Sequence, residues 1–421
     1  MSESQEPAEE STQFTLRLAS PTGAFNVVAV LESDKEGPNP PRLVTVSKED
    51  SDGHTSDVHS SDRETQVVLS VGSGHRLAAR FFQDTVSPLL KHIYGEEEFA
   101  NIQIHETKSE TSILQLVSEC FFPEAQQGKP LRIILASGDG GIVDLVNGLL
   151  AKPASPKYVA PQVVLLPLGT ANALYHSINA GRDNTWGLDT LTSATSKPLP
   201  VFTASFSPGS RLLVDEARSE EELPKDPTSG HGVLHGAVVC SWGMHASLVA
   251  DSDTPEYRKY GVDRFKMAAQ AALYPVDGSP PHPYTAKVSV RKGDAAAWST
   301  LPGTQHLYVL ATLVSHLEHP FCISPHSTPL DGSLHLVHFG PTSGDEAMRI
   351  MGQAYQGGKH IQDPAVRYEA IDGLRIEFER HEDEPRWRRI CIDGKIVRVE
   401  SNGWVEVKKQ PRRALEVVTR W

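Results

Sequence analysis

The stretch that decides the fold is LRIILASGDGGIVDLVNGLL, which runs from Leu131 to Leu150. It begins as a mostly apolar strand and then, at Ile142, Leu145, Val146 and Leu149, becomes apolar at helical spacing. Between strand and helix lies Ser-Gly-Asp-Gly-Gly, whose glycines give up backbone order that other residues would keep. A glycine loop that opens a helix offers free N–H groups and a positive dipole end to an anion, so phosphate binding is the first hypothesis.

The order strand, loop, helix occurs four times between Gln66 and about residue 190. The four units are QVVLSVGSGHRLAARFFQDTVSPLLKHIYG, ANIQIHETKSETSILQLVSEC, the stretch quoted above, and QVVLLPLGTANALYHSI. Strands alternating with helices predict a parallel sheet with helices on its faces and ligands at the carboxyl ends of the strands. All four small-residue loops fall at those ends, which predicts one site built from four loops.

After about residue 190 the pattern becomes β-rich, with many short strands and turn signals, and this predicts a sandwich or open barrel. SEEELPKDPTSGHG and YPVDGSPPHPY indicate loops, and Pro255–Leu273 indicates one helix with a basic face. The fold class is therefore α/β plus all-β: a doubly wound α/β nucleotide-binding domain (66–190) followed by a β-sandwich domain (191–421). The last segment of the sandwich domain is a candidate to pack back on the first domain.

Residues 1–65 form an acidic N-terminal region and linker. FTLRLA and FNVVAVLE alternate like short strands, whereas Ser47–Thr65 is polar and typical of a solvated linker. A small β extension and a largely unfolded segment both stay open as interpretations of this region.

Composition excludes several classes of protein. A formal net charge of −13 leaves no basic excess for general nucleic-acid binding. The four cysteines lie far apart without a CxxC pair, which favours reduced thiols in an intracellular protein. The first residues do not resemble a signal peptide and no apolar run is as long as a membrane span. We therefore expect a cytoplasmic protein whose contact with membranes, if any, is peripheral.

Two aspartates carry the chemistry of the glycine loop. A carboxylate beside a phosphate is useful when it holds Mg²⁺ or accepts a proton from an attacking hydroxyl, and Asp139 and Asp144 are placed for either role. The alternative is a tight turn with Asp144 as an acid favoured by the helix dipole. In PLGTANAL, Thr170 and Asn172 suit a helix cap or a phosphate contact. GxxxxGK[ST] is absent, and GxGxxG fails at Val143.

Histidine pairs occur in HLEH (His316, His319) and HLVH (His335, His338). Both segments are typical of strands or strand ends, where three-residue spacing places the pair on opposite faces. Ordinary strand and loop histidines are therefore favoured over a zinc site.

Several of these motifs resemble the diacylglycerol kinase catalytic family. SGDG with Asn147-Gly148 resembles its nucleotide loop, in the form found in sphingosine kinases. PLGTANAL resembles the family's P-x-G-[ST]-x-N-x-[LF], and SVGSGHRLA resembles N-P-x-S-G-x-x-x-A. SWGMHASLVADSDTPEYRKYGVDRF, HPFCISPHSTPLDGSLHLV and CIDGKIVRVE resemble further segments of the sphingosine kinase branch, in the same order.

The resemblance implies a two-domain, ATP- and Mg²⁺-dependent lipid kinase that acts on a sphingoid base or a related lipid such as diacylglycerol at a membrane surface. It implies Asp139 as the base that deprotonates the lipid hydroxyl, with Asp139 and Asp144 as catalytic and metal positions. The implied nucleotide site comprises Ser70, Ser73, Gly74, Ser137, Gly138, Gly140, Gly141, Gly169, Thr170, Asn172, Arg258, Arg264, Asp393, Gly394 and Lys395. The implied substrate positions are Ser247, Asp251 and Asp253.

Three departures from the family pattern define the alternatives. Ser70 and Val71 replace Asn-Pro, Gly141 follows GDG, and Lys395 replaces the glutamate of DGE, which inverts its charge. One alternative is a catalytically impaired homologue that binds nucleotide or lipid as a regulatory module. The other is a kinase of a soluble substrate, because NAD kinases share a GDG loop and a similar two-domain plan. The oligomeric state is not readable from the sequence.

Overall fold

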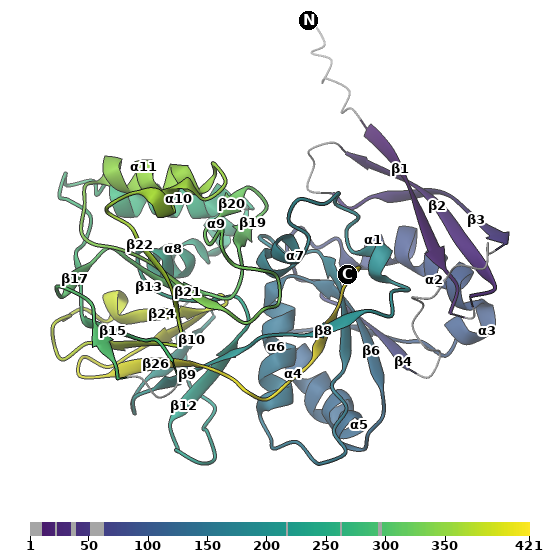
Figure 1. Ribbon diagram of the computed structural model, residues 1–421, viewed down its shortest axis with the longest axis horizontal. Helices are drawn as coiled ribbons and strands as arrows, with labels where there is room; N and C mark the ends of the chain where they lie inside the picture. The colour runs from purple at the N-terminus through teal and green to yellow at the C-terminus, as the bar shows by residue number, and fades with distance from the viewer. Residues whose placement is uncertain are drawn as a thin grey trace, which may run out of the picture.

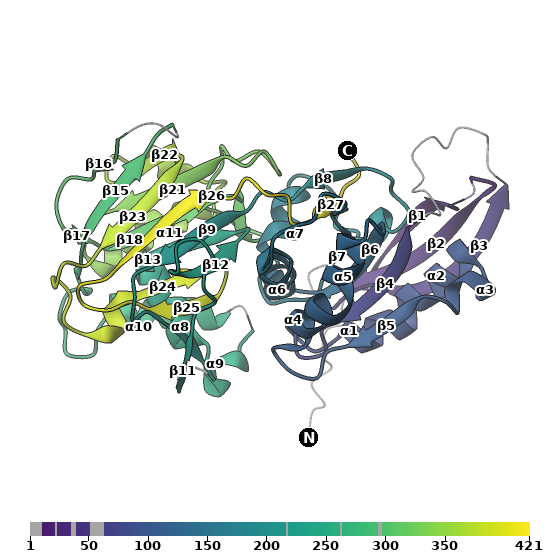
Figure 2. The same ribbon diagram turned by 90° about the horizontal axis from the view of Figure 1, so that it is seen from below.

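The computed structural model describes residues 11–21, 23–34, 39–50, 63–215, 218–261, 263–293 and 297–421. They form two lobes that lie side by side, one α/β and one almost entirely β (Figures 1 and 2). A six-stranded, mostly parallel sheet with helices forms the first lobe, and two large antiparallel sheets form the second. The predicted fold class is thus confirmed.

The α/β sheet has the strand order β5-β4-β6-β7-β27-β8. The strands span Glu64–Leu69 (β4), Gln103–Glu106 (β5), Leu131–Ser137 (β6), Gln162–Pro167 (β7), Ser196–Pro198 (β8) and Glu416–Val418 (β27). Strands β4 to β7 pair in parallel, β27 joins β7 in parallel, and β8 closes the edge antiparallel to β27. The carboxyl ends of β4, β6 and β7 therefore share one edge, as the alternation of strands and helices predicts.

Both faces of this sheet are buried, and alternate residues of each strand reach opposite faces. Val68 and Leu135 pack with the helices that follow β5 and β6, whereas Val67 and Leu69 pack with those that follow β4. The helices span Ala78–Phe81 (α1), Ser87–Tyr94 (α2), Glu96–Phe99 (α3), Ser112–Leu116 (α4), Phe122–Gln126 (α5), Asp139–Leu150 (α6) and Ala173–Ile178 (α7). Wider π turns at Phe82–Val86 and Val117–Phe121 join α1 to α2 and α4 to α5.

A three-stranded antiparallel sheet, β1 (Ser11–Ala19), β2 (Phe25–Asp34) and β3 (Arg42–Asp50), precedes the α/β sheet. Its buried side chains, such as Leu18 and Ala29, pack with Leu89 of α2. The predicted linker at Ser47–Thr65 is wrong at both ends, because β3 continues to Asp50 and β4 begins at Glu64. The rest of that linker, and most of the acidic stretch at 1–12, lie outside the described residues.

The β lobe is a sandwich of an eight-stranded sheet, β11-β10-β25-β24-β13-β18-β21-β22, and a six-stranded sheet, β12-β9-β26-β23-β15-β16. The first sheet comprises Arg211–Val214 (β10), Ser219–Glu222 (β11), Val239–Gly243 (β13), Tyr308–Thr312 (β18), Leu334–Phe339 (β21), Arg367–Ile371 (β22), Arg389–Ile392 (β24) and Lys395–Arg398 (β25). The second comprises Phe202–Phe206 (β9), Gly232–Gly236 (β12), Lys287–Arg291 (β15), Ser299–Thr300 (β16), Gly373–Glu377 (β23) and Trp404–Lys409 (β26). Two small ribbons pair Tyr284–Thr285 (β14) with Gln305–His306 (β17), and His316–Glu318 (β19) with Phe321–Cys322 (β20).

Four helices belong to this lobe: Met244–Ser252 (α8), Pro255–Arg258 (α9), Asp263–Leu273 (α10) and Gly344–Ala354 (α11). The single helix predicted over Pro255–Leu273 is wrong, because Gly261 has φ +53° and separates α9 from α10. The loop predicted from Ser219 is also wrong at its start, since Ser219–Glu222 pairs with β10. In the described residues no helix is both long and apolar enough to cross a membrane.

Candidate active site

Three of the four predicted loops meet at the carboxyl edge of the α/β sheet. A Cβ placed on Gly138 would lie 2.6 Å from the Cα of Gly169, so the two backbones are in contact. The N–H of Gly138 donates to Ser73 Oγ at 3.2 Å. Gly74 has φ +49°, and a Cβ there would lie 2.4 Å from the carbonyl oxygen of Leu168. Gly74, Gly138 and Gly169 are therefore required by close backbone approach. We call residues 70–78, 137–141 and 167–172 the loop cluster.

The start of α6 is the anion-binding feature of the loop cluster. The helix begins at Asp139, so Asp139, Gly140 and Gly141 form its first turn. A Cβ on Gly141 would lie 2.5 Å from Ser137 Oγ, whereas Gly140 faces open space. The first N–H groups of a helix lack partners within it, and the open side at Gly140 leaves room for a phosphate.

Asp139 joins the two glycine loops. Its Oδ2 accepts the N–H of Ala173 at 2.8 Å and its Oδ1 accepts the N–H of Leu174 at 3.0 Å. The Asp139 carboxylate therefore accepts two backbone N–H groups in the first turn of α7, the helix that begins within PLGTANAL. Burial raises the pKa of Asp139, and the two hydrogen bonds limit that rise. The carboxylate is thus held in a fixed position with increased basicity, as a proton acceptor needs.

Asn172 fixes the second glycine loop. It has φ +52°, its Oδ1 accepts the N–H of Gly169 at 2.8 Å, and its Nδ2 donates to the Gly169 carbonyl at 3.0 Å. Thr170 is half-buried beside it. In the first loop, the N–H of Ser70 donates to the carbonyl oxygen of Ala136, and the N–H of Val71 donates to Thr107 Oγ1. Thr107 lies in the loop after β5, which was predicted to contribute to this site, but no motif in the sequence singles out its hydroxyl.

Asp144 faces the β lobe and pairs with it. Lys395 Nζ lies 2.8 Å from Asp144 Oδ1, and both side chains are largely buried. Burial raises the pKa of Asp144, and the ammonium of Lys395 lowers it. The lysine that departs from the family pattern therefore neutralises the second aspartate of the glycine loop.

Lys395 reaches Asp144 from a tight hairpin. Asp393 (φ +48°) and Gly394 (φ +92°) form its two-residue turn between β24 and β25. The Asp393 carboxylate accepts the N–H groups of Ala237, Val238 and Val239, at distances from 2.5 to 3.1 Å. Burial raises the pKa of Asp393 to about 7, and the charge of Asp139 contributes to the rise. We call residues 389–398 the hairpin.

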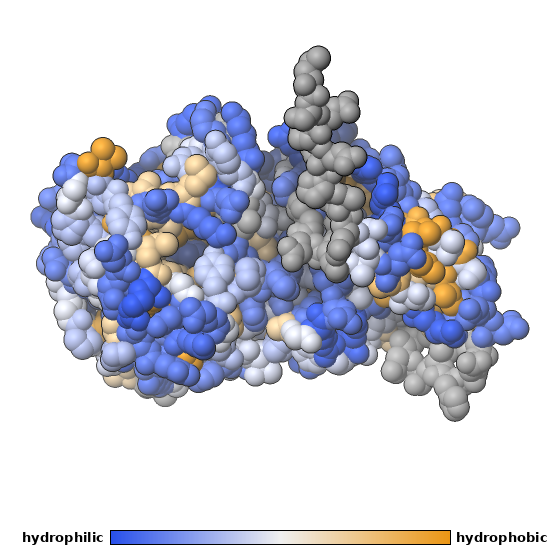
Figure 3. Space-filling model, turned by 90° about the horizontal axis from the view of Figure 1, so that it is seen from above, coloured by the Kyte–Doolittle hydropathy of each residue, from blue (hydrophilic) through white to orange (hydrophobic). Residues whose placement is uncertain are grey.

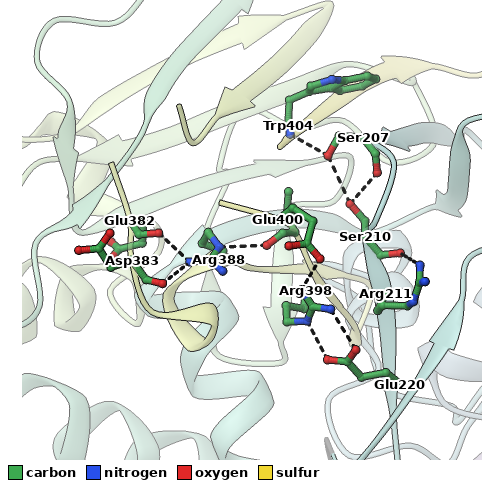
Figure 4. Close-up of polar contacts among 11 residues, drawn as sticks. Ser207, Ser210, Arg211, Glu220, Glu382, Asp383, Arg388, Arg398, Glu400 and Trp404 are labelled. Carbon is green, nitrogen blue, oxygen red and sulfur yellow. Dashed lines mark hydrogen bonds and ion pairs between the residues drawn. The ribbon is translucent and has the colours of Figure 1, made fainter. Parts of the chain in front are cut away.

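Arginines anchor the strands of the hairpin (Figure 4). Arg388 donates to the carbonyls of Glu382 and Asp383 at 2.7 and 2.6 Å. Arg398 makes a two-point contact with Glu220, at 2.7 and 3.0 Å, and a third bond to Glu400 at 2.8 Å. These bonds fix the base of the hairpin, so the position of Lys395 at its tip is set by the fold of the β lobe.

A second contact between the lobes involves Asn147. Its Nδ2 donates to the His235 carbonyl at 2.8 Å, and its Oδ1 accepts the His235 N–H at 2.9 Å. The neighbouring Gly148 lets α6 approach Val117, whose side chain would lie 2.7 Å from an added Cβ. Both residues of this Asn-Gly pair therefore have a structural role: Asn147 joins α6 to the β lobe, and Gly148 lets α6 pack closely against Val117.

The two predicted arginines lie on different helices. Arg258 ends α9 and makes two bonds to Asp253 at 2.9 and 3.1 Å, while Arg264 in α10 reaches the same carboxylate at 3.3 Å. A Cβ on Gly261 between them would lie 3.6 Å from His75 of the first loop. The segment that holds both arginines therefore approaches the loop cluster.

The three predicted substrate positions already have partners within the protein. Asp253 forms ion pairs with Arg258 and Arg264, which neutralise its charge. Asp251 pairs with Arg389 at 2.8 Å. Ser247 is buried, and its Oγ accepts the hydroxyl of Tyr284 at 2.8 Å. Ser247 is thus enclosed, whereas the paired carboxylates of Asp251 and Asp253 are still about half exposed, at 55% and 42%.

The loop cluster fits the phosphates of a nucleotide, since its glycines bring three backbones together beside an open helix start. The fit to Mg²⁺ differs between the two aspartates. Over the described part of the chain, no group of three or more His, Cys, Asp and Glu is placed to hold a metal ion. Mg²⁺ is often held by one or two carboxylates together with substrate phosphates. Asp139 fits that role, because each of its oxygens can accept a second bond. Asp144 does not fit while it pairs with Lys395.

Comparison with known proteins agrees with this geometry. Residues 65–204 match the family model of the diacylglycerol kinase catalytic domain. Sphingosine kinase 1 of Rattus norvegicus is 24% identical over 361 residues, which cover 79% of this chain and 85% of the relative. Sphingosine kinase 1 of Homo sapiens is 24% identical over 340 residues, covering 74% and 81%.

A solved structure of a putative diacylglycerol kinase from Bacillus anthracis str. Sterne shares the fold. It aligns with a TM-score of 0.54 at 15% sequence identity, over 85% of this chain and 95% of that chain. The family model covers all four of the strand–loop–helix units, and the structural match extends over both lobes. Residues 65–204 are therefore similar to the diacylglycerol kinase catalytic domain, and most of the chain is similar to sphingosine kinases.

Proposed function

We propose that the protein is an ATP- and Mg²⁺-dependent lipid kinase that phosphorylates a hydroxyl of a sphingoid long-chain base or of a related lipid such as diacylglycerol. The observation that carries the proposal is Asp139, whose carboxylate bridges the two glycine loops beside the open start of α6. The names of the relatives, sphingosine kinase and diacylglycerol kinase, support a lipid alcohol as the acceptor. The protein acts in the cytoplasm and associates peripherally with membranes.

In the proposed reaction Asp139 accepts the proton of the acceptor hydroxyl. The new bond joins that oxygen to the γ-phosphorus, and the bond from this phosphorus to the ADP oxygen breaks. The N–H groups at the start of α6 orient the phosphates, and Arg258 and Arg264 offset the charge of the group in transfer. ATP supplies the phosphoryl group, and Mg²⁺ would reduce the negative charge of its phosphates.

The first test is transfer of labelled phosphate from ATP to a panel of sphingoid bases, diacylglycerol and NAD. Wild type is expected to label a lipid, and Asp139→Asn is expected to lower turnover by about 10²- to 10⁴-fold, the usual contribution of a general base. Asp84→Asn changes a surface aspartate of the same lobe and is the matched control. Full turnover by Asp139→Asn contradicts the mechanism, and labelling of NAD alone contradicts the lipid acceptor.

Asp139→Asn also removes one acceptor from the start of α7, so its stability must be measured beside its activity. An amide directed at the N–H of Ala173 or Leu174 is expected to cost about 1–2 kcal/mol of unfolding free energy. Normal nucleotide binding by the variant, measured by calorimetry, separates loss of the base from loss of the fold.

The Lys395–Asp144 pair favours one second candidate, a regulatory homologue that binds nucleotide or lipid without phosphoryl transfer. That candidate predicts measurable ATP binding without a labelled product, and a gain of activity in Lys395→Glu. The proposed kinase predicts the opposite for Lys395→Glu, because two carboxylates would then face each other at the edge of the site.

A further inference from the structure

Three histidines gather where the α/β lobe meets the β lobe. His176 lies in α7 of the first lobe, whereas His316 and His319 come from the β19–β20 ribbon of the second. Helix α7 contacts β19, and Figure 1 shows both in the middle of the molecule, between the lobes. The rings of His176 and His319 have centroids 5.2 Å apart and meet edge to face. We call His176, His316 and His319 the histidine cluster.

The prediction that His316 and His319 lie on opposite faces holds only within a strand. His319 follows the last residue of β19, in the turn that leads to β20, so the alternation of faces does not apply to it. Both side chains act electrostatically on His176. Since no group of three or more His, Cys, Asp and Glu in the described residues is placed to hold a metal ion, the cluster is not a zinc site.

Ser177 ties the backbone beside the cluster across the two lobes. Its Oγ accepts the N–H of His316 at 2.9 Å and donates to the carbonyl oxygen of the same residue at 3.2 Å. The ring of His316 is held in turn by Ser315, whose Oγ lies 2.8 Å from Nδ1. Movement of β19 away from α7 therefore breaks both bonds to Ser177.

The charges that act on His176 are themselves those of histidines. Over the part of the chain that the structure describes, they come from His319 and His316, and no carboxylate acts on His176. Glu318 lies between these two histidines in sequence, but its Oε1 accepts the hydroxyl of Tyr355 at 2.6 Å. Protons taken up by the cluster therefore have no paired anion to balance them.

The other titratable neighbours of the cluster stay neutral. The ring of Tyr175 lies 5.5 Å from that of His176, and burial raises the pKa of its hydroxyl. Cys322 is opposite His316 in the ribbon, and burial raises the pKa of its thiol. Neither group supplies a negative charge at neutral or acidic pH.

The closed contact disfavours protonation of the cluster. Burial, followed by the charges of His319 and His316, lowers the pKa of His176 to about 4. Burial and the charge of His319 also lower the pKa of His316. An unperturbed histidine has a pKa of about 6.5. Between these values the separated lobes bind more protons than the closed lobes, so a fall in pH favours separation.

The interface beside the cluster is only partly closed by apolar contacts. Leu174 and Ile178 of α7 line one small cavity together with Leu313 and Val314 of the β lobe, so packing between the lobes is incomplete there. Figure 3 shows mostly hydrophilic surface where the two lobes meet, outside the grey atoms. His319 itself is exposed, so protons reach the cluster from solvent.

We propose that the histidine cluster is an acid-sensitive latch between the two lobes, closed when its rings are neutral and opened when they are protonated. Two protonated rings would place like charges 5.2 Å apart, between ring centres, without a counter-ion. Opening moves the β lobe, and with it Lys395, away from Asp144 and the loop cluster. The latch goes beyond the proposed function, because it is a change of shape that occurs with or without phosphoryl transfer.

The experiment measures the distance between spin labels on the two lobes as a function of pH. Ala180→Cys follows α7 and Gln356→Cys follows α11, both at exposed positions, in a chain where Cys120→Ser removes the one cysteine that is not buried. The distance is expected to lengthen as the pH falls from 7.5 to 4.5, with a midpoint between about 4 and about 6.5. Circular dichroism over the same range is expected to show unchanged helix content.

Two variants of the cluster change its charge in opposite directions. His176→Phe with His319→Gln takes up no proton at these positions and is expected to keep the short distance at pH 5. His176→Lys carries a positive charge at neutral pH and is expected to show the long distance already at pH 7.5. His326→Gln, at an exposed histidine elsewhere in the β lobe, is the matched control and is expected to open with the wild-type midpoint.

Four results would overturn the latch. They are an unchanged distance in wild type down to pH 4.5, a wild-type midpoint in the Phe and Gln double variant, a short distance in His176→Lys at pH 7.5, and loss of helix content together with the change in distance. The second result would assign the pH response to Asp393 or His235, whose pKa values are about 7 and about 4. Absence of kinase activity leaves the latch standing, since none of these measurements uses phosphoryl transfer.

Discussion

The loop cluster and the hairpin meet at the same site but are held in different ways. The loop cluster is backbone against backbone, with Gly138 and Gly169 in contact and no side chain between them. The hairpin acts through charge, with Asp393 on three amide groups and Lys395 on Asp144. Steric contacts of the first kind allow no adjustment, whereas contacts of the second kind depend on protonation. The two regions therefore differ in what can disturb them.

The largest effect is expected in the loop cluster. In Gly169→Ala the new Cβ would lie 2.4 Å from the Cα of Gly138 and 2.9 Å from Asn172 Oδ1, so the loops must separate. We expect a loss of about 3 kcal/mol in the free energy of unfolding, together with loss of nucleotide binding. Urea denaturation measures the first and calorimetry the second.

The control is Gly140→Ala, where the structure has open space around the new methyl group. Its stability is expected to stay within about 1 kcal/mol of wild type. Equal stabilities for the two alanine variants would show that the glycine contact does not hold the loops in place.

The next largest effect is expected in Asp393→Asn. Asparagine tolerates the left-handed conformation of the turn, so this variant tests the carboxylate and leaves the backbone alone. The substitution replaces one carboxylate oxygen, which accepts hydrogen bonds, by an NH2 group that cannot, at a place where three backbone N–H groups converge. We expect the free energy of unfolding to fall by about 2 kcal/mol. Asp331→Asn, at an exposed carboxylate that accepts one N–H, should cost much less in the same denaturation experiment.

The smallest effect is expected in Lys395→Met, and it varies with pH. Without the ammonium, burial and the charge of Glu110 both raise the pKa of Asp144 with no offset, so this pKa rises further. At pH values above the ordinary pKa of an aspartate, the native state then binds more protons than the unfolded state. The free energy of unfolding therefore falls as the pH rises. We expect a loss of about 1–2 kcal/mol at pH 8 and a smaller loss at pH 5. A loss that is the same at both values would show that Asp144 does not depend on Lys395.

The same contrast explains which parts of the site could be predicted. The loop cluster follows from local sequence, because three strands end in small residues at one edge of a parallel sheet. The resemblance to the diacylglycerol kinase catalytic family predicts Asp139 and the glycines as site residues without any knowledge of their contacts. The charge pairs of the hairpin join residues far apart in the chain, such as Asp144 and Lys395, and no local pattern indicates them. The bonds of Asp253 to Arg258 and Arg264 were also missed, although these residues lie only 5 and 11 positions apart in the chain.

Two errors in the β lobe have identifiable signals. Gly261, in the middle of the predicted helix, marks the break between α9 and α10. Helix α11 was not predicted, although Ser343 and Glu346 have the spacing of a capping box and the N–H of Glu346 donates to Ser343 Oγ. Strand β10 has no comparable signal, since its four residues gain their pairing from β11 and three of them also pair with β25.

Strand β27 has a consequence for the order in which the protein is made. Two of its residues pair with β7 on one side and all three pair with β8 on the other, so the α/β sheet lacks an inner strand until residues 416–418 have been synthesised. At usual rates of translation the ribosome needs roughly 10 to 40 seconds to make the chain from β8 to β27. During that time the whole β lobe is synthesised, and Pro198 and Gln162 lack Glu416, the strand partner that both share. A chain that ends before residue 416 therefore cannot assemble the finished sheet of the α/β lobe.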